Sequence, residues 1–160
     1  MREFPEKVYT EQEHKLAKRL VDAGYKHELT VEGDTDFVEK VNKALDLAKT
    51  AGYYDFLRTY LRQIKEIDGL TQLRETEVAI WANKPAVQDA VDFASLLVQK
   101  ANHMKEYLEG ELYYGGASEK RTAQKRIEFL ETLQAKTADA VVKEQCGKLL
   151  DMWHEFGLAV

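Results

Sequence analysis

The chain has 160 residues, of which 44% are hydrophobic and 32% charged, and its formal net charge is −5 at pH 7. This length and balance are typical of one globular domain with its own core, and no linker or repeat divides residues 1–160. The acidic charge argues against a nucleic-acid partner, and no apolar run approaches the roughly 20 residues of a membrane span, so we expect a soluble, cytoplasmic protein without a membrane segment.

The N-terminal part of the chain predicts a helix, a short strand and a second helix. Thr10 and Glu13 fit a capping box, which starts the first helix, and Gly24 ends it. Residues 26–31 alternate polar and apolar side chains and predict a short strand. Apolar side chains then recur every three or four positions over residues 37–48, which indicates the second helix.

The middle of the chain predicts a further helix and a further strand. Residues 53–67 resume the helical spacing of apolar side chains, and Asp68 with the following glycine is a turn signal. Residues 75–82 are the best strand candidate, because Val78 and Ile80 alternate with the residues between and after them.

The longest predicted helix, at about residues 86–109, is apolar around much of its circumference and is therefore expected to be central. Ser118 is a suitable N-cap for the next helix, and Thr137 is one for the last. Cys146 is the single cysteine and fits a small core residue, so no internal disulfide can form. These elements predict a helix-dominated α+β fold with a small β-sheet or hairpin packed on the central helix. The alternative is an all-α bundle, if the two strands do not form.

The central helix carries a spacing that metal sites use. Gln99 and His103 are four residues apart, so both lie on one face of a helix, one turn from each other. Two ligands at this spacing can share one metal ion. Glu119, at the start of the following helix, is a candidate for a third ligand.

The segment from Thr76 to Leu133 resembles a glutamate-zincin (gluzincin-like) metallopeptidase domain in which the defining motif is broken. The resemblance implies that His103 stands at the second ligand histidine and Glu119 at the third ligand. Gln99 replaces the first histidine, and a neutral amide is a poor zinc ligand. Lys100 replaces the general base, and its ammonium cannot accept a proton near neutral pH unless its pKa falls far.

We therefore expect a non-catalytic, metallopeptidase-like domain without a metal, a cofactor or a catalytic residue. In such enzymes the strand before the central helix forms the edge over the substrate cleft, which implies a peptide or protein partner here. The expected partner surface comprises Val78, Ile80, Trp81, Tyr113 and Tyr114.

Two other functions fit the same sequence. One is a plain helical protein-interaction domain without enzymatic ancestry, in which His103 is structural and Glu119 simply opens a helix. The other is a metal-dependent hydrolase that uses other residues. The sequence indicates no oligomeric state.

Overall fold

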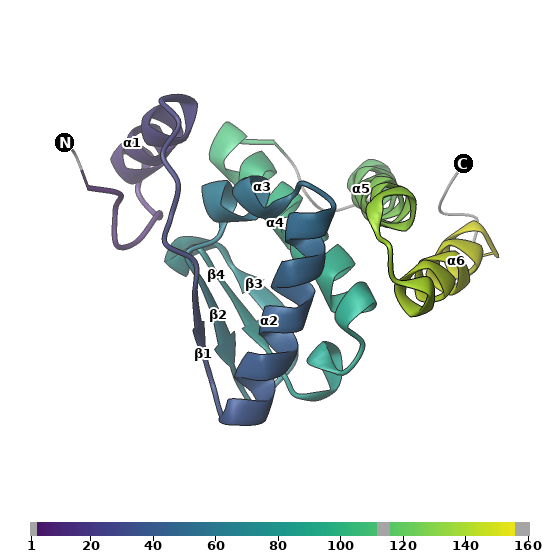
Figure 1. Ribbon diagram of the computed structural model, residues 1–160. Coiled ribbons are helices and arrows are strands. Elements are labelled where there is room, and N and C mark those ends of the chain that lie inside the picture. The colour runs from purple at the N-terminus through teal and green to yellow at the C-terminus, as the bar shows by residue number, and fades with distance from the viewer. Residues whose placement is uncertain (1–2, 112–115, 156–160) are drawn as a thin grey trace.

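The computed structural model describes residues 3–111 and 116–155. These residues form a helix-dominated α+β fold with a four-stranded mixed sheet (Figure 1). The predicted fold class is thus confirmed, and the all-α alternative is wrong because the sheet exists. The α-helices are α1 (Glu11–Asp22), α2 (Thr35–Thr50), α3 (Tyr54–Tyr60), α4 (Ala90–Glu109), α5 (Gly116–Lys136) and α6 (Ala140–Glu155). The strands are β1 (Thr30–Glu32), β2 (Gln63–Glu66), β3 (Gln72–Arg74) and β4 (Ala79–Ala82), with 3-10 turns η1 (Glu75–Glu77) and η2 (Pro85–Val87).

The first helix begins as its sequence predicts. Thr10 Oγ1 accepts a hydrogen bond from the Glu13 amide at 3.1 Å, and the Glu13 carboxylate accepts one from the Thr10 amide at 2.8 Å. The strand predicted over residues 26–31 is shorter, and β1 starts at Thr30. The residues before Thr30 do not pair with β2. The His27 amide instead donates to the carbonyl of Arg58, near the end of α3.

The sheet has the strand order β1-β2-β4-β3, with β1, β2 and β4 parallel and β3 antiparallel at one edge. The helix predicted over residues 53–67 is wrong in its second half, since α3 ends at Tyr60 and β2 follows. Ile64 is buried in the strand and would also be buried in a helix. Its spacing from the preceding apolar residues therefore did not distinguish helix from strand. Pairing on both sides of β2 decides in favour of the strand.

The strand predicted over residues 75–82 is divided by Val78. Residues 75–77 form η1, and Val78 has φ of 56°, a left-handed conformation that is rare for a β-branched residue. Its amide donates to the carbonyl of Glu75, and its side chain is fully buried. The chain therefore turns at this point, so that only Ala79–Ala82 enter the sheet as β4.

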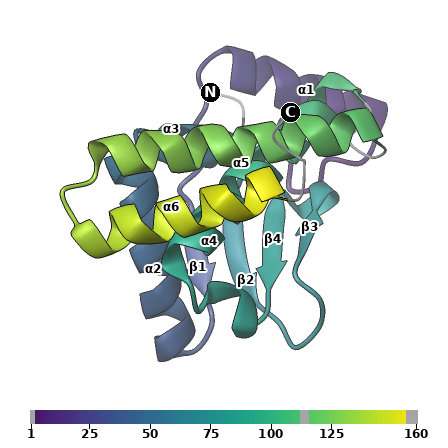
Figure 2. The ribbon, with the colours of Figure 1, turned by 90° about the vertical axis from the view of Figure 1, so that its right-hand side faces the viewer.

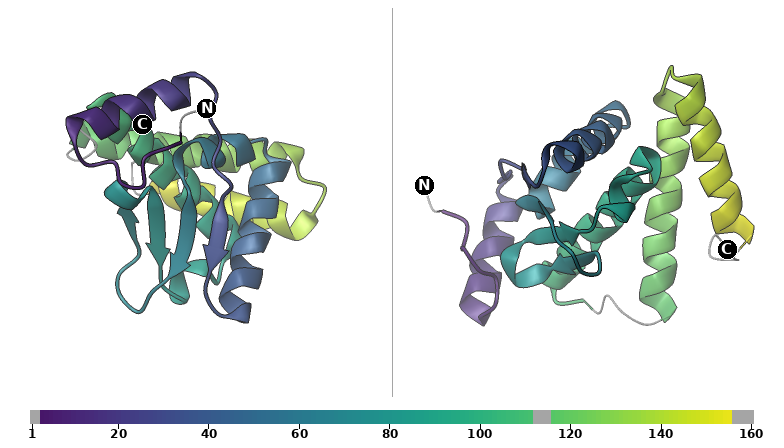
Figure 3. Two further views of the ribbon diagram at one scale, coloured as in Figure 1. Left: turned by 90° about the vertical axis from the view of Figure 1, so that its left-hand side faces the viewer. Right: turned by 90° about the horizontal axis from the view of Figure 1, so that it is seen from below.

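Helices cover one face of the sheet and leave the other open (Figure 3). α2 and α4 pack beside the sheet, α5 and α6 lie beyond α4, and α1 lies near one end of the strands (Figures 1 and 2). Ile64 and Ile80 point to the covered face and are fully buried. Lys65 and Trp81 point the opposite way and are only half-buried.

The central position predicted for α4 is confirmed, since it contacts α1, α2, α3, α5 and α6. Ser118 lies within the first turn of α5 rather than before it, and the cap of α6 is Asp139, whose carboxylate accepts from the Val141 amide at 2.9 Å. Cys146 is buried, as predicted. Tyr113 and Tyr114 lie outside the described residues. Within the described ranges, no helix has the length and apolar character needed to cross a membrane.

Candidate functional site

The polar face of α4 faces η1 and α5, and it carries Lys100 and His103. Both side chains are half-buried. Burial and, to a smaller extent, the charge of Lys100 lower the pKa of His103 from 6.5 to about 4, and the carboxylate of Glu75 partly opposes both effects. The imidazole is therefore neutral at neutral pH.

Lys100 is the residue that the sequence resemblance led us to expect in place of a general base. Burial lowers its pKa, the Arg126 guanidinium lowers it further, and Glu75 opposes the change. Glu75 directly follows β3, and Leu73 of β3 packs against a hydrophobic cluster that includes Met104 of α4.

Gln99 is already bonded to an internal cation. Arg126, on α5, is 9% exposed and donates from Nη1 to Gln99 Oε1 at 3.1 Å. The same guanidinium donates to Ser95 Oγ at 3.1 Å and to Asp92 Oδ1 at 2.7 Å. Its other side stacks on the ring of Trp153 at 4.8 Å. A positive charge with four partners thus stands next to the position expected for the first metal ligand.

A second ion pair, between the half-exposed Arg121 and the buried Glu106, joins α5 to α4. Arg121 Nε donates to Glu106 Oε2 at 2.7 Å, and Glu106 is only 4% exposed. Glu106 Oε1 and the buried Ser118 Oγ have no hydrogen-bond partner in the described part of the chain. The Arg121 side chain is 46% exposed, so this polar contact between the helices is open to solvent on one side.

Glu119 does not join these groups. It lies in the exposed first turn of α5, while its neighbour Thr122 is buried and donates to the Glu119 carbonyl at 2.9 Å. Over residues 3–111 and 116–155, no three histidine, cysteine, aspartate or glutamate side chains lie together as a metal site would require. The side chain of α5 that contacts Gln99 is Arg126.

The expected partner surface on the strand before α4 is wrong in part. Val78 and Ile80 are fully buried, and β4 is paired on both sides, with β2 and with β3. Trp81 is half-buried on the open face of the sheet. The edge strand beyond β4 is β3, which pairs only with β4 among the described strands (Figure 2).

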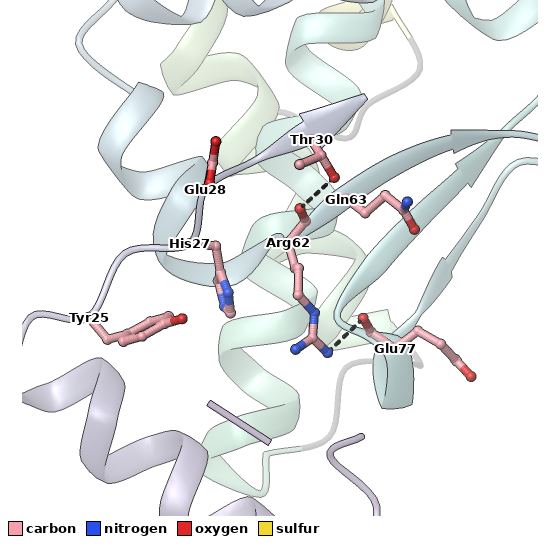
Figure 4. A pocket seen from close by; sticks show the side chains of 7 residues that line it. All are labelled: Tyr25, His27, Glu28, Thr30, Arg62, Gln63 and Glu77. Atoms are coloured by element: carbon pink, nitrogen blue, oxygen red, sulfur yellow. Dashed lines mark hydrogen bonds between the residues drawn. The ribbon is translucent and has the colours of Figure 1, made fainter. Parts of the chain in front are cut away.

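A separate cavity of about 440 Å³ lies where β1 and β2 begin (Figure 4). Arg62 crosses it and donates to the carbonyls of Pro5, Glu6 and Glu77 at 3.0, 2.7 and 3.2 Å. His27 is 2% exposed, and burial lowers its pKa to about 4. The polar groups mainly fix the N-terminal segment to the sheet. The cavity is lined by Tyr25, His27, Glu28, Thr30, Arg62, Gln63 and Glu77.

Comparison of the chain with protein-family models, curated proteins and solved structures finds no match. The site therefore has to be interpreted from its own geometry.

The sequence analysis did not predict two features of this geometry, the contacts of Arg126 and the strand β3. Arg126 lies four residues before Leu130 on the buried stripe of α5, so a basic residue in an apolar stripe was the available signal. The edge strand β3 has three residues and carried no alternation long enough to recognise.

Proposed function

We propose that the chain is a non-catalytic peptide-binding domain on a scaffold resembling a glutamate-zincin, and that an extended peptide adds to the sheet along β3. The observation that carries this proposal is the position of β3. It is an antiparallel edge strand whose outer side has no strand partner among the described residues, and its Leu73 packs against a cluster that includes Met104 of α4.

The chemistry of that face supports a binding role rather than hydrolysis. Lys100 stands where a base is needed, and Gln99 offers its amide oxygen to Arg126 rather than to a metal. The cation of Arg126 would also repel a metal dication at this place. None of the three groups can activate water in this arrangement.

The N-terminal segment already bonds to η1, just beyond this edge. Directly beyond β3, the Val8 amide donates to the Thr76 carbonyl at 2.9 Å, and Tyr107 donates its hydroxyl to the Val8 carbonyl at 2.6 Å. Backbone groups at an open edge pair readily with another extended chain. The described edge of β3 before Thr76 has the same groups without this cover.

The binding test uses three short blocked peptides that alternate valine with glutamate, threonine or lysine, followed by amide NMR spectra of the protein. We expect at least one peptide to shift the amide signals of Gln72 and Leu73 more than those of Val31 on the opposite edge. An analogue N-methylated on its pairing side should lose these shifts, because it cannot form the ladder. Unchanged β3 signals with all three peptides, or equal binding of the N-methylated analogue, would contradict the proposal.

The zincin ancestry has its own test. Gln99→His with Lys100→Glu restores the ligand and the base, and a further Arg126→Met change removes the competing cation. We expect the triple variant to bind zinc more tightly than the wild type in calorimetry, and His103→Asn in that background to reverse the gain. No gain in the triple variant favours the alternative, an interaction domain without enzymatic ancestry.

A further inference from the structure

The other edge strand, β1, is also unpaired on its outer side. Among the described strands it pairs only with β2, and it is the outermost strand at its edge of the sheet (Figures 1 and 3). The Thr30 amide donates to the carbonyl of Arg62, just before β2, at 3.1 Å. Because the backbone groups of successive residues in a strand point to opposite sides, the N–H and C=O of Val31 point away from β2. Within the described ranges, this edge therefore offers a donor and an acceptor to a further extended chain.

A hollow of about 500 Å³ lies beside this edge, between β1 and α2. Val31 lies opposite Ile64 in the register, so its side chain is on the covered face of the sheet, where it packs against the core. Leu29 and Val38 line the same hollow, and all three of the apolar side chains Leu29, Val31 and Val38 are only half-buried. Half-buried apolar side chains next to a free strand edge fit the alternate side chains of a strand that continues the sheet.

The charges at this edge favour uncharged side chains in a ligand. In the hollow, the Asp46 carboxylate and the Lys49 ammonium lie 3.9 Å apart and neutralise each other. On the open face, Glu32 stands on the edge strand itself, and its cross-strand neighbour Lys65 is on β2. An acidic residue of an added strand would therefore lie directly beside Glu32, whereas Lys65 would be one strand further away.

We propose that β1 is a second site of strand addition, and that it takes an extended, uncharged peptide with β-branched apolar residues at alternate positions. The apolar side chains lie in the hollow beside Val31 and Val38, and the intervening polar side chains lie beside Thr30 and Glu32. This inference goes beyond the proposed function, because it concerns the opposite edge and a different kind of sequence. A second copy of the chain is a poorer occupant, since its own β1 would bring two Glu32 carboxylates to one face of the sheet.

The test follows the amide signal of Val31 and the methyl signals of Val38 by NMR while the threonine–valine peptide is added. We expect both to shift, and we expect the affinity to fall about fivefold for each valine replaced by alanine, because two partly buried methyl groups are lost. The glutamate–valine peptide should leave the Val31 signal unchanged. Shifts confined to Leu73, or an alanine peptide that binds equally well at Val31, would overturn this inference and leave strand addition at β3 intact. No shift at either edge with any peptide would overturn both.

The matched variants are Val38→Gln, in the hollow, and Leu70→Gln, next to the start of β3, where the leucine is 83% exposed. Val38→Gln should lower the affinity of the threonine–valine peptide for β1 about fivefold, and Leu70→Gln should leave it unchanged. An unchanged affinity in Val38→Gln would contradict the inference. If Val38→Gln does not fold, a threonine–valine peptide N-methylated on its pairing side decides with the wild type, because it should lose the Val31 shift. A dimer of the protein alone in sedimentation, dissociated by Val38→Gln, would assign the edge to a second copy and overturn the inference.

Discussion

Two arginine–tryptophan pairs occur among residues 3–111 and 116–155, and their surroundings differ. Arg126 stacks on Trp153 at 4.8 Å between helices, with its side chain 10% exposed and its donors directed to Asp92, Ser95 and Gln99. Arg74 stacks on Trp81 at 4.4 Å on the open sheet face, with its side chain 39% exposed and one ion pair at 3.6 Å. The pair of Arg126 and Trp153 thus holds helices together inside the protein, whereas the pair of Arg74 and Trp81 lies on the surface, where the guanidinium is accessible to a partner.

The difference teaches how to separate stability from recognition in this chain. A buried guanidinium with all its partners inside the protein stabilises one arrangement of α4, α5 and α6, and has nothing left for a ligand. A half-exposed guanidinium beside an open strand costs little to redirect towards a partner.

The largest expected effect comes from Arg126→Ala. It leaves Ser95 and Gln99 without their buried donor and Asp92 without its partner, so we expect a loss of about 2–3 kcal/mol in the free energy of unfolding, measured with urea. The value is at the lower end for buried pairs because the Asp92 side chain is 44% exposed. Arg126→Met, which restores apolar volume, should cost less. If Arg126→Ala lowered the free energy of unfolding by less than about 0.5 kcal/mol, the proposed difference between the two arginine–tryptophan pairs would be contradicted.

The second effect is a dependence of stability on pH. Burial lowers the pKa of His27 and of His103 from 6.5 to about 4. The unfolded chain therefore binds more protons than the folded one between these values, so stability is fully present above pH 6.5, falls as the pH decreases towards about 4, and then levels off. Urea unfolding at several pH values measures the slope. His103→Asn should make the slope shallower, and an unchanged slope would show that the side chain is not effectively buried.

The third prediction concerns Arg74→Ala, which should affect stability less than Arg126→Ala does and should affect peptide binding more. Arg74→Ala removes a stacked but half-exposed cation, so we expect it to cost less than about 1 kcal/mol in the free energy of unfolding. The same change should lower the affinity of the protein for the glutamate–valine peptide. If Arg74→Ala destabilised the protein as much as Arg126→Ala, both pairs would be structural and the comparison would fail.

The smallest effect is expected for Lys65→Ala. Its ammonium lies 5.9 Å from the centre of the Trp81 ring, the longer of the two cation contacts on that ring. Thermal unfolding should therefore be unchanged within error. A clear drop in the unfolding temperature would show that the cation contacts of Trp81 also stabilise the fold.

The sequence predicted those elements whose signals are local. The capping box at Thr10, the apolar circumference of α4 and the buried Cys146 follow from residue spacing alone. The strands β2 and β3 did not, because each is four residues or fewer and its pairing comes from distant segments. The bonds of Arg126 were not predictable either, since they depend on how α5 turns towards α4.

Amide hydrogen exchange of the wild-type protein, with and without the glutamate–valine peptide, tests the central claim most directly. Strand addition at β3 predicts slower exchange at Leu73, whose backbone faces away from β4, and no change at Val31 in β1. Protection confined to α4, equal protection of both edges, or no protection would contradict a peptide-binding edge at β3.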